Sequence, residues 1–199
     1  MGIMVQSNSI SAAFTEAFTA RNISFSPLII GVLLAVFAFF IFVGGTKRLS
    51  AVVEKVVPFM AVIYIIGSIL LLIMNASHIP YAFKQIFVCA FSPQSMLGGA
   101  AGITIQQAIR YGVARGLFSN EAGMGSTPHA HARATAKSPH EQGLVAMVSM
   151  FIDTFIILTL TALSVLCTGA LASGKTGVAL TQEAFINTFG GAGDLFVAF

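Results

Sequence analysis

Charged side chains are scarce in this sequence. They make up only 9% of its 199 residues, whereas hydrophobic residues make up 56%. A soluble globular domain carries roughly 25% charged residues, so this chain has too little polar surface for a water-soluble particle. The mean hydropathy of +0.90 agrees, and the same values exclude a disordered chain and a soluble coiled coil. The apolar residues form long blocks of the length that crosses a bilayer as a helix, which predicts an all-α, polytopic membrane helix bundle.

Cysteine is also rare, and the charge balance is only mildly basic. Cys89 and Cys167 lie far apart in apolar surroundings and form no recognisable motif. The net charge of +3 fits an inner-membrane protein that keeps Lys and Arg on cytoplasmic loops, so no nucleic-acid partner is predicted. Residues 1–11 lack the basic region of a signal peptide, and residues 195–199 begin a new hydrophobic run. We therefore expect a fragment truncated at both ends, with the remainder of its own chain as a partner.

Three apolar blocks are predicted to span the lipid bilayer. They cover residues 27–45, 56–75 and 143–170, and Pro27 and Pro58 are each expected in a first helical turn. Residues 2–18 are expected to end a further spanning helix that faces protein or water. Residues 46–55 are predicted as a charged loop, 76–93 as an interfacial helix, 128–142 as a polar loop and 172–188 as an extramembrane segment. The more basic side, which we expect to be cytoplasmic, holds Lys47, Arg48, Lys55, Arg133 and Lys137.

Residues 98–126 are unusually polar for a segment that must cross the membrane between two spans. Arg110, Arg115 and Glu121 would each cost roughly 2.5–3.5 kcal/mol at the centre of a spanning helix. They are therefore expected to form charge pairs, to line a wet cavity or to lie near a cation.

Glycines accompany these charges and favour a break in the helix. Gly116, Gly123 and Gly125 bracket residues 117–122, which include Ser and Asn. A break frees backbone groups that lipid cannot satisfy but that a carboxylate, sodium or an ammonium group can. The alternative is an unbroken helix that its glycines pack against neighbours, with the charges as buried pairs.

Asp153 is the other polar signal within a predicted span. An acid in a membrane helix is a functional candidate by default, and both a structural and a cation-binding role remain open for it. Three histidines in the 128–142 loop lack further ligands at metal-site spacing, so no metal site is predicted. No serine is matched with a histidine on a neighbouring span, so we expect no enzyme. A channel could use the same broken helix, and saturable, sodium-dependent uptake would distinguish a transporter from it.

Residues 108–128, AIRYGVARGLFSNEAGMGSTP, closely resemble the signature of the alanine or glycine:cation symporter family. Residues 4–10, 143–147 and 151–154 are also similar to that family, so the resemblance covers essentially the whole chain. It implies the leucine-transporter-like inverted-repeat fold of the amino acid–polyamine–organocation superfamily. Residues 1–199 would then form a partial transporter domain of about core helices three to seven, with 98–126 as the unwound helix six.

The resemblance also implies roles for individual residues. Gln6 matches a glutamine near the substrate, although Ile3 stands where a polar residue is expected. Phe118, Ser119 and Asn120 match the unwound substrate-binding stretch, and Gly116, Gly123 and Gly125 match the glycines that permit unwinding. The implied function is sodium-coupled symport of small neutral amino acids, alanine or glycine, across the bacterial cytoplasmic membrane by alternating access. Sodium would be a co-substrate, and no cofactor is implied.

Overall fold

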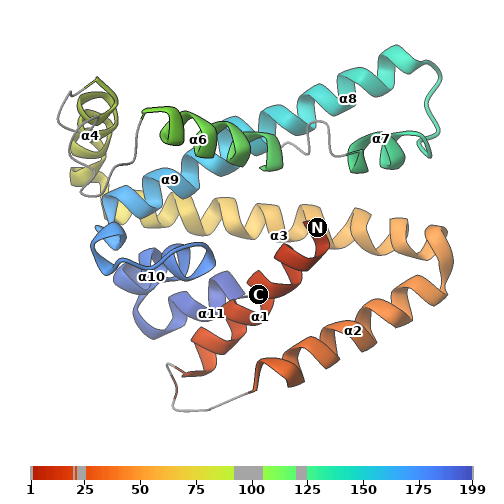
Figure 1. Cartoon of the computed structure of the whole chain (residues 1–199), viewed down its shortest axis with the longest axis horizontal. Coiled ribbons are helices and arrows are strands. Elements are labelled where there is room, and N and C mark those ends of the chain that lie inside the picture. The colour runs from red at the N-terminus through yellow and green to blue at the C-terminus, as the bar shows by residue number, and fades with distance from the viewer. Residues whose placement is uncertain (1, 20, 22–25, 92–104, 120–124, 199) are drawn as a thin grey trace. The chain divides into compact units, whose positions relative to one another are not determined.

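The chain folds into helices throughout the part that the structure describes. The computed structural model describes residues 2–19, 21, 26–91, 105–119 and 125–198, and every regular element within these ranges is helical (Figure 1). The predicted all-α class is confirmed. The chain divides into two compact units, Met1–Ile79 with Leu160–Phe199, and Pro80–Thr159.

The first unit contains the two ends of the chain. Its elements are α1 (Gly2–Thr19), α2 (Pro27–Val43), α3 (Gly45–Met74), the 3₁₀ turns η1 (Ala76–His78), η3 (Ala170–Ser173) and η4 (Gly190–Ala192), α10 (Val178–Phe189) and α11 (Gly193–Ala198). Most of α9 (Leu158–Cys167) also belongs to it. Helix α2 begins at Pro27 as predicted, where a proline wastes no helical hydrogen bond.

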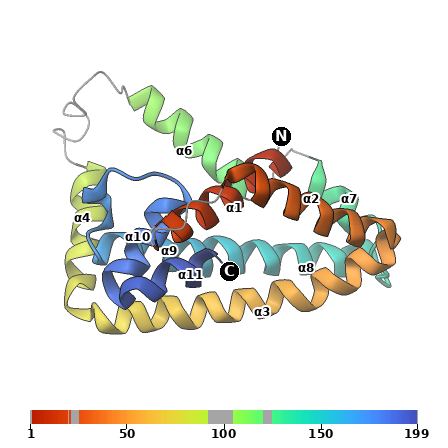
Figure 2. The ribbon, with the colours of Figure 1, turned by 90° about the horizontal axis from the view of Figure 1, so that it is seen from below.

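The predicted loop at 46–55 is wrong. Helix α3 already begins at Gly45, so Pro58 lies inside the helix rather than in its first turn. Gly45 has φ +69°, a left-handed conformation that suits glycine, and it reverses the chain immediately after α2 (Figure 2). The charged residues of this stretch are mostly exposed good helix formers, so the helix simply continues past its apolar part.

Helices α10 and α11 pack against each other and against α1. Phe185 is fully buried, and its ring stacks on that of Phe196 at a centroid distance of 5.1 Å. Ala13, Ala17 and Ala184 are also buried. Such small side chains let helices approach closely.

Charged contacts reinforce this packing. Arg21, two residues past the end of α1, donates to both carboxylate oxygens of Asp194 at 2.7 and 3.1 Å, and Asp194 is only 1% exposed. The buried amide of Gln182 donates to the carbonyls of Ala13 and Asp194. These contacts fasten the C-terminal half of α1, the helix that carries Gln6, to α10 and α11.

Lys175, in the loop before α10, adds two further ion pairs to the same region. Its ammonium lies 2.5 Å from a carboxylate oxygen of Glu16 and 3.0 Å from one of Glu183. Its hydrogen bonds to Glu16 and Glu183 raise the pKa of Lys175.

Large apolar side chains cover the outside of the long helices. On α2, Phe37, Phe39, Phe40 and Phe42 are each at least 60% exposed. Soluble monomers rarely expose contiguous apolar patches of this kind. Two helical runs of the described residues, Gly45–Met74 and Pro139–Cys167, are long and apolar enough to cross a membrane, and the shorter Pro27–Val43 is also apolar. These surfaces fit contact with lipid.

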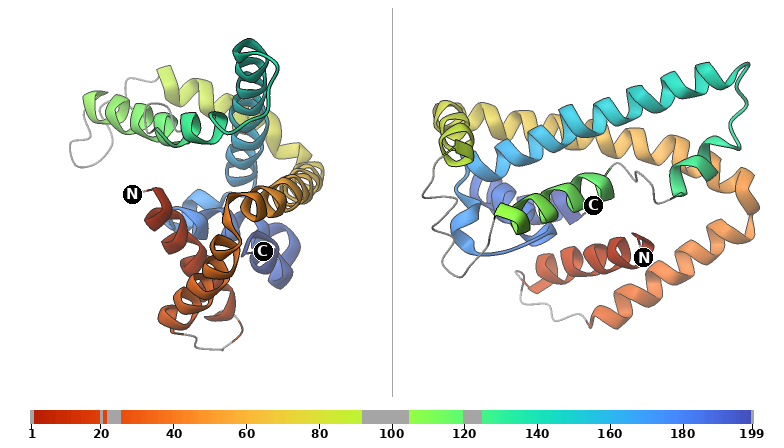
Figure 3. Two further views of the ribbon diagram at one scale, coloured as in Figure 1. Left: turned by 90° about the vertical axis from the view of Figure 1, so that its right-hand side faces the viewer. Right: turned by 45° about the horizontal axis from the view of Figure 1, so that its top comes forward.

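The second unit contains α4 (Ile79–Phe91), α6 (Ile105–Ser119), α7 (Ser126–His131), α8 (Pro139–Phe151) and the π-helix η2 (Ile152–Ile157). Helix α8 begins with Ser138, whose side chain accepts from the backbone N–H of Glu141, as an N-cap does. Helix α8 continues directly into η2, and the helical run extends to Cys167 in the sequence (Figure 3). The predicted interfacial helix at 76–93 corresponds to η1 and α4.

Candidate functional site

Ser119 and Asp153 form a direct side-chain contact within the second unit. The Ser119 hydroxyl donates to Asp153 Oδ2 at 2.9 Å. Ser119 is the last residue of α6, and Asp153 is the second residue of η2. The contact joins two residues that the sequence singled out for different reasons, 34 positions apart.

The backbone around Asp153 departs from regular α-helix. Residues Ile152–Ile157 form a π-helix, in which the N–H of Leu158 donates to the carbonyl of Asp153, five residues back. π-Helical turns are rare, and they occur frequently at functional sites. The wider turn changes the register of the helix next to the carboxylate, and no sequence signal predicted it.

The charge balance at this contact is uneven. An ionised carboxylate can accept about four hydrogen bonds, and among the described residues Asp153 receives one, from Ser119. No Lys, Arg or His in that part of the chain forms an ion pair with it. Arg110 and Arg115 lie on α6, are exposed, and likewise form no ion pair with a described residue.

The predicted helix break is described only at its two sides. Helix α6 ends at Ser119, while Asn120, Glu121 and Gly123 lie outside the described residues. Gly125 has φ +85° and immediately precedes α7, so regular helix cannot run through it. Gly116 lies within α6, and a Cβ added there would meet no described atom within 4 Å, so a packing role of this glycine is not visible.

Of the other predicted substrate residues, Phe118 and Gln6 are described, and both are exposed residues of helices. Phe118 precedes Ser119 on α6 and is 37% exposed. Gln6 is an exposed residue of α1 and belongs to the first unit. Among the described residues of the predicted set, Ser119 and Asp153 are the pair in direct hydrogen-bond contact.

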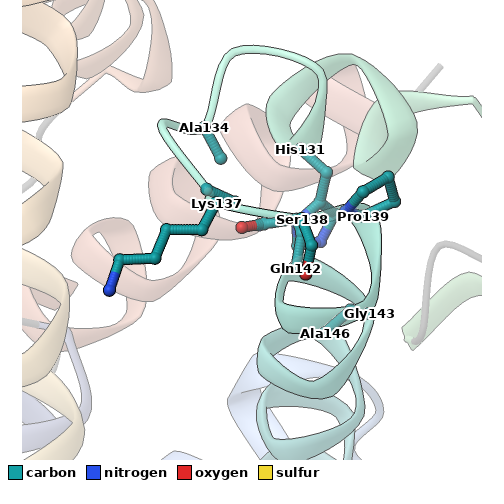
Figure 4. A pocket seen from close by; sticks show the side chains of 9 residues that line it. His131, Ala134, Lys137, Ser138, Pro139, Gln142, Gly143 and Ala146 are labelled. Carbon is teal, nitrogen blue, oxygen red and sulfur yellow. The ribbon is translucent and has the colours of Figure 1, made fainter.

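An open cavity of about 550 Å³ lies elsewhere in the second unit, where the 132–138 loop meets the start of α8 (Figure 4). Its walls include His131, Lys137, Ser138 and Gln142, and Gln142 Nε2 contacts the His131 ring. None of the predicted substrate residues that the structure describes lines this cavity. We therefore regard the Ser119–Asp153 contact as the better candidate for chemistry.

Two helical runs of membrane-spanning length, one of which carries the acid that contacts Ser119, are features of a membrane helix bundle. A family model described as "Sodium:alanine symporter family" matches residues 1–199. The chain belongs to this sodium:alanine symporter family, and the resemblance drawn from residues 108–128 is confirmed. The family and the names of relatives indicate a transporter rather than an enzyme.

Several relatives share this stretch of sequence. The uncharacterized transporter YflA of Bacillus subtilis is 42% identical over 98% of this chain and 41% of its own length. The sodium/alanine symporter AgcS of Methanococcus maripaludis is 40% identical over 93% of this chain and 40% of its own length. The probable sodium/glutamine symporter GlnT of Bacillus subtilis is 38% identical over 98% of this chain and 39% of its own length. The chain thus spans about two fifths of the length of these relatives.

Proposed function

We propose that the complete protein is a secondary active transporter that couples sodium entry to the uptake of small neutral amino acids, alanine and glycine, across the cytoplasmic membrane. The observation that carries this proposal is the contact between Ser119 and Asp153. A serine at the end of a polar, glycine-flanked helix meets the carboxylate of an apolar one. Ionisable groups at such positions in membrane helices mark substrate and ion pathways.

The mechanism we propose is alternating access in a leucine-transporter-like fold, with this chain supplying about core helices three to seven. The amino acid would bind beside the break that follows Ser119, with Gln6, Phe118 and Asn120 as further contacts. Ends of broken helices offer backbone N–H groups to a carboxylate and carbonyls to a cation. The side chain of Phe118 would limit the size of the bound amino acid. Glu121, Arg110 and Arg115 are proposed to balance charge along the pathway.

A membrane potential favours this direction of transport. One positive charge that moves inward gains about 2.3 kcal/mol per 100 mV, before the sodium gradient contributes. One sodium ion per amino acid would therefore suffice for appreciable accumulation.

Uptake of radiolabelled alanine by the complete protein in proteoliposomes tests the proposal. We expect saturable uptake that requires an inward sodium gradient, is inhibited by unlabelled glycine and falls when Gln6 is replaced by Ala. Glutamine as a competitor tests the substrate range, because one relative bears the name of a glutamine symporter. Uptake that is indifferent to sodium, or driven equally by a proton gradient alone, would contradict sodium coupling.

A further inference from the structure

Two serine hydroxyls are buried in the first unit without a hydrogen-bond partner among the described residues. Ser68 lies on α3 and Ser164 on α9, and both residues are 0% exposed. Neither hydroxyl forms a hydrogen bond with a residue that the structure describes. A buried hydroxyl loses its bonds to solvent, so buried polar groups nearly always have a partner in the protein or an ordered water. These two serines therefore need an explanation.

A contact one helical turn earlier indicates where the two serines lie. The hydroxyls of Tyr64 on α3 and Thr161 on α9 are 2.6 Å apart. Residues three or four positions apart share one face of a helix, so each serine follows one member of this contact on the same face. Helices α3 and α9 run in the same direction in Figure 1 and in Figure 2. Ser68 and Ser164 therefore lie at the same level between the two helices.

The lengths of the side chains leave space between the two serines. Tyr64 reaches Thr161 with the full length of its phenol side chain, whereas a serine hydroxyl lies only one bond beyond Cβ. At a similar separation of the two backbones, the hydroxyls of Ser68 and Ser164 cannot meet directly. One bridging water fills a gap of this kind, since two hydrogen bonds in succession span about 5.5 Å.

The surroundings of this gap are closed and uncharged. Phe185 is 0% exposed, and the centroid of its ring lies 6.0 Å from that of Tyr64. A Cβ added at Gly67, next to Ser68, would clash with the ring of Phe196. The serine hydroxyls are neutral, as are the hydroxyls of the contact one turn earlier, so a cation would be buried there without a counter-charge. The site therefore fits water rather than an ion.

From these observations we infer that Ser68 and Ser164 bind one shared, buried water molecule that joins α3 to α9. Such waters typically make two to four hydrogen bonds to buried polar groups that otherwise lack partners. A serine hydroxyl can donate one hydrogen bond and accept others, so one water satisfies both serines. None of the residues proposed to contact the amino acid takes part, and the site does not depend on the proposed function.

Thermal unfolding of the complete protein in detergent tests this inference. A double-mutant cycle of Ser68→Ala and Ser164→Ala measures whether the two hydroxyls act together. If each hydroxyl lacks a partner, its removal should raise Tm, because a buried unsatisfied group is lost. If each instead bonds to a carbonyl of the preceding turn of its own helix, its removal should change Tm little.

A shared water gives a different pattern. We expect each single Ala variant to lower Tm by about 2 °C, the effect of one lost neutral hydrogen bond. The double variant should lower Tm by less than the two single effects together, because no hydroxyl then remains to be satisfied. Ser68→Asn should keep Tm close to that of the wild type, since its longer amide side chain can take the place of the water and reach Ser164.

Ser149→Ala is the matched control. Ser149 is an exposed residue of α8, and its hydroxyl donates to the carbonyl of Val145 in its own helix, so this variant should leave Tm unchanged. Single Ala variants that raise Tm, that match this control or whose effects simply add would each overturn the shared water. A clear fall in Tm for Ser68→Asn would also overturn it, because it would indicate that the two serines are in direct contact.

Discussion

The ion pair between Arg21 and Asp194 should control how firmly α10 and α11 dock on α1. Asp194 is only 1% exposed, and the Arg21 guanidinium contacts both of its oxygens as well as the carbonyls of Ala17 and Gly191. Arg21→Ala leaves a buried carboxylate without its arginine. Loss of one partner of a buried pair costs about 3–5 kcal/mol. Since the Arg21 side chain is 33% exposed, water can replace part of the interaction, and we expect the lower end, about 3 kcal/mol.

Hydrogen–deuterium exchange of the complete protein in detergent measures this effect locally. If α10 and α11 open as one local unit, about 3 kcal/mol corresponds to exchange roughly 100-fold faster, because about 1.4 kcal/mol is a factor of ten. Adding Asp194→Asn should recover part of the protection, because the buried charge is then absent. Arg48→Ala is the control, since Arg48 is an exposed arginine with no ion pair to a described residue. Exchange in α10 and α11 that matches this control would refute the reasoning.

Three further perturbations test other parts of the structure. Gly193→Ala should lower the thermal stability, because its Cβ would clash with the backbone carbonyl of Phe185 in α10, whereas Gly191→Ala, with no described atom within 4 Å, should not. The raised pKa of Lys175 belongs to the folded state, so its stabilising contribution is complete below the ordinary value of 10.5 and is lost as the pH rises through the higher folded value. If the melting temperature is measured as the pH rises into this alkaline range, it should therefore fall less for Lys175→Gln than for wild type. Deletion of Ile156 from the π-helix should weaken sodium-dependent uptake more than Ile156→Ala does. Equal uptake by the two variants would count against a role for the wider π-helical turn.

The helices of this protein could largely be predicted from sequence because block length and hydropathy are local properties. Pro27 marked the start of α2, whereas the predicted helix break lies mostly outside the described residues, which show only that α6 ends at Ser119 and that Gly125 is non-helical. The error at 46–55 has a physical cause. Charged residues with good helix propensity can extend a membrane helix beyond its apolar part, so a loss of hydropathy marks the end of the lipid-facing stretch and not the end of the helix.

The candidate site was only partly predictable. Ser119 came from the family resemblance and Asp153 from its charge within an apolar block, but their contact joins residues 34 positions apart and no local pattern reports it. The same holds for Arg21 and Asp194, which are separated by 173 positions. The π-helix had no sequence signature of its own, because Asp153 marks a polar position in Ile152–Ile157 but not a change of helical register.

The π-helix also changes the register of the helix next to Asp153, which lies near its start and receives the Ser119 hydroxyl. In a regular α-helix each residue turns about the helix axis by about 100° and advances along it by about 1.5 Å, so the backbone alone fixes the direction of each side chain. A hydrogen bond that reaches five residues back changes that relation locally. The helix can therefore turn its carboxylate toward Ser119 without a break, which would expose unsatisfied backbone groups to lipid.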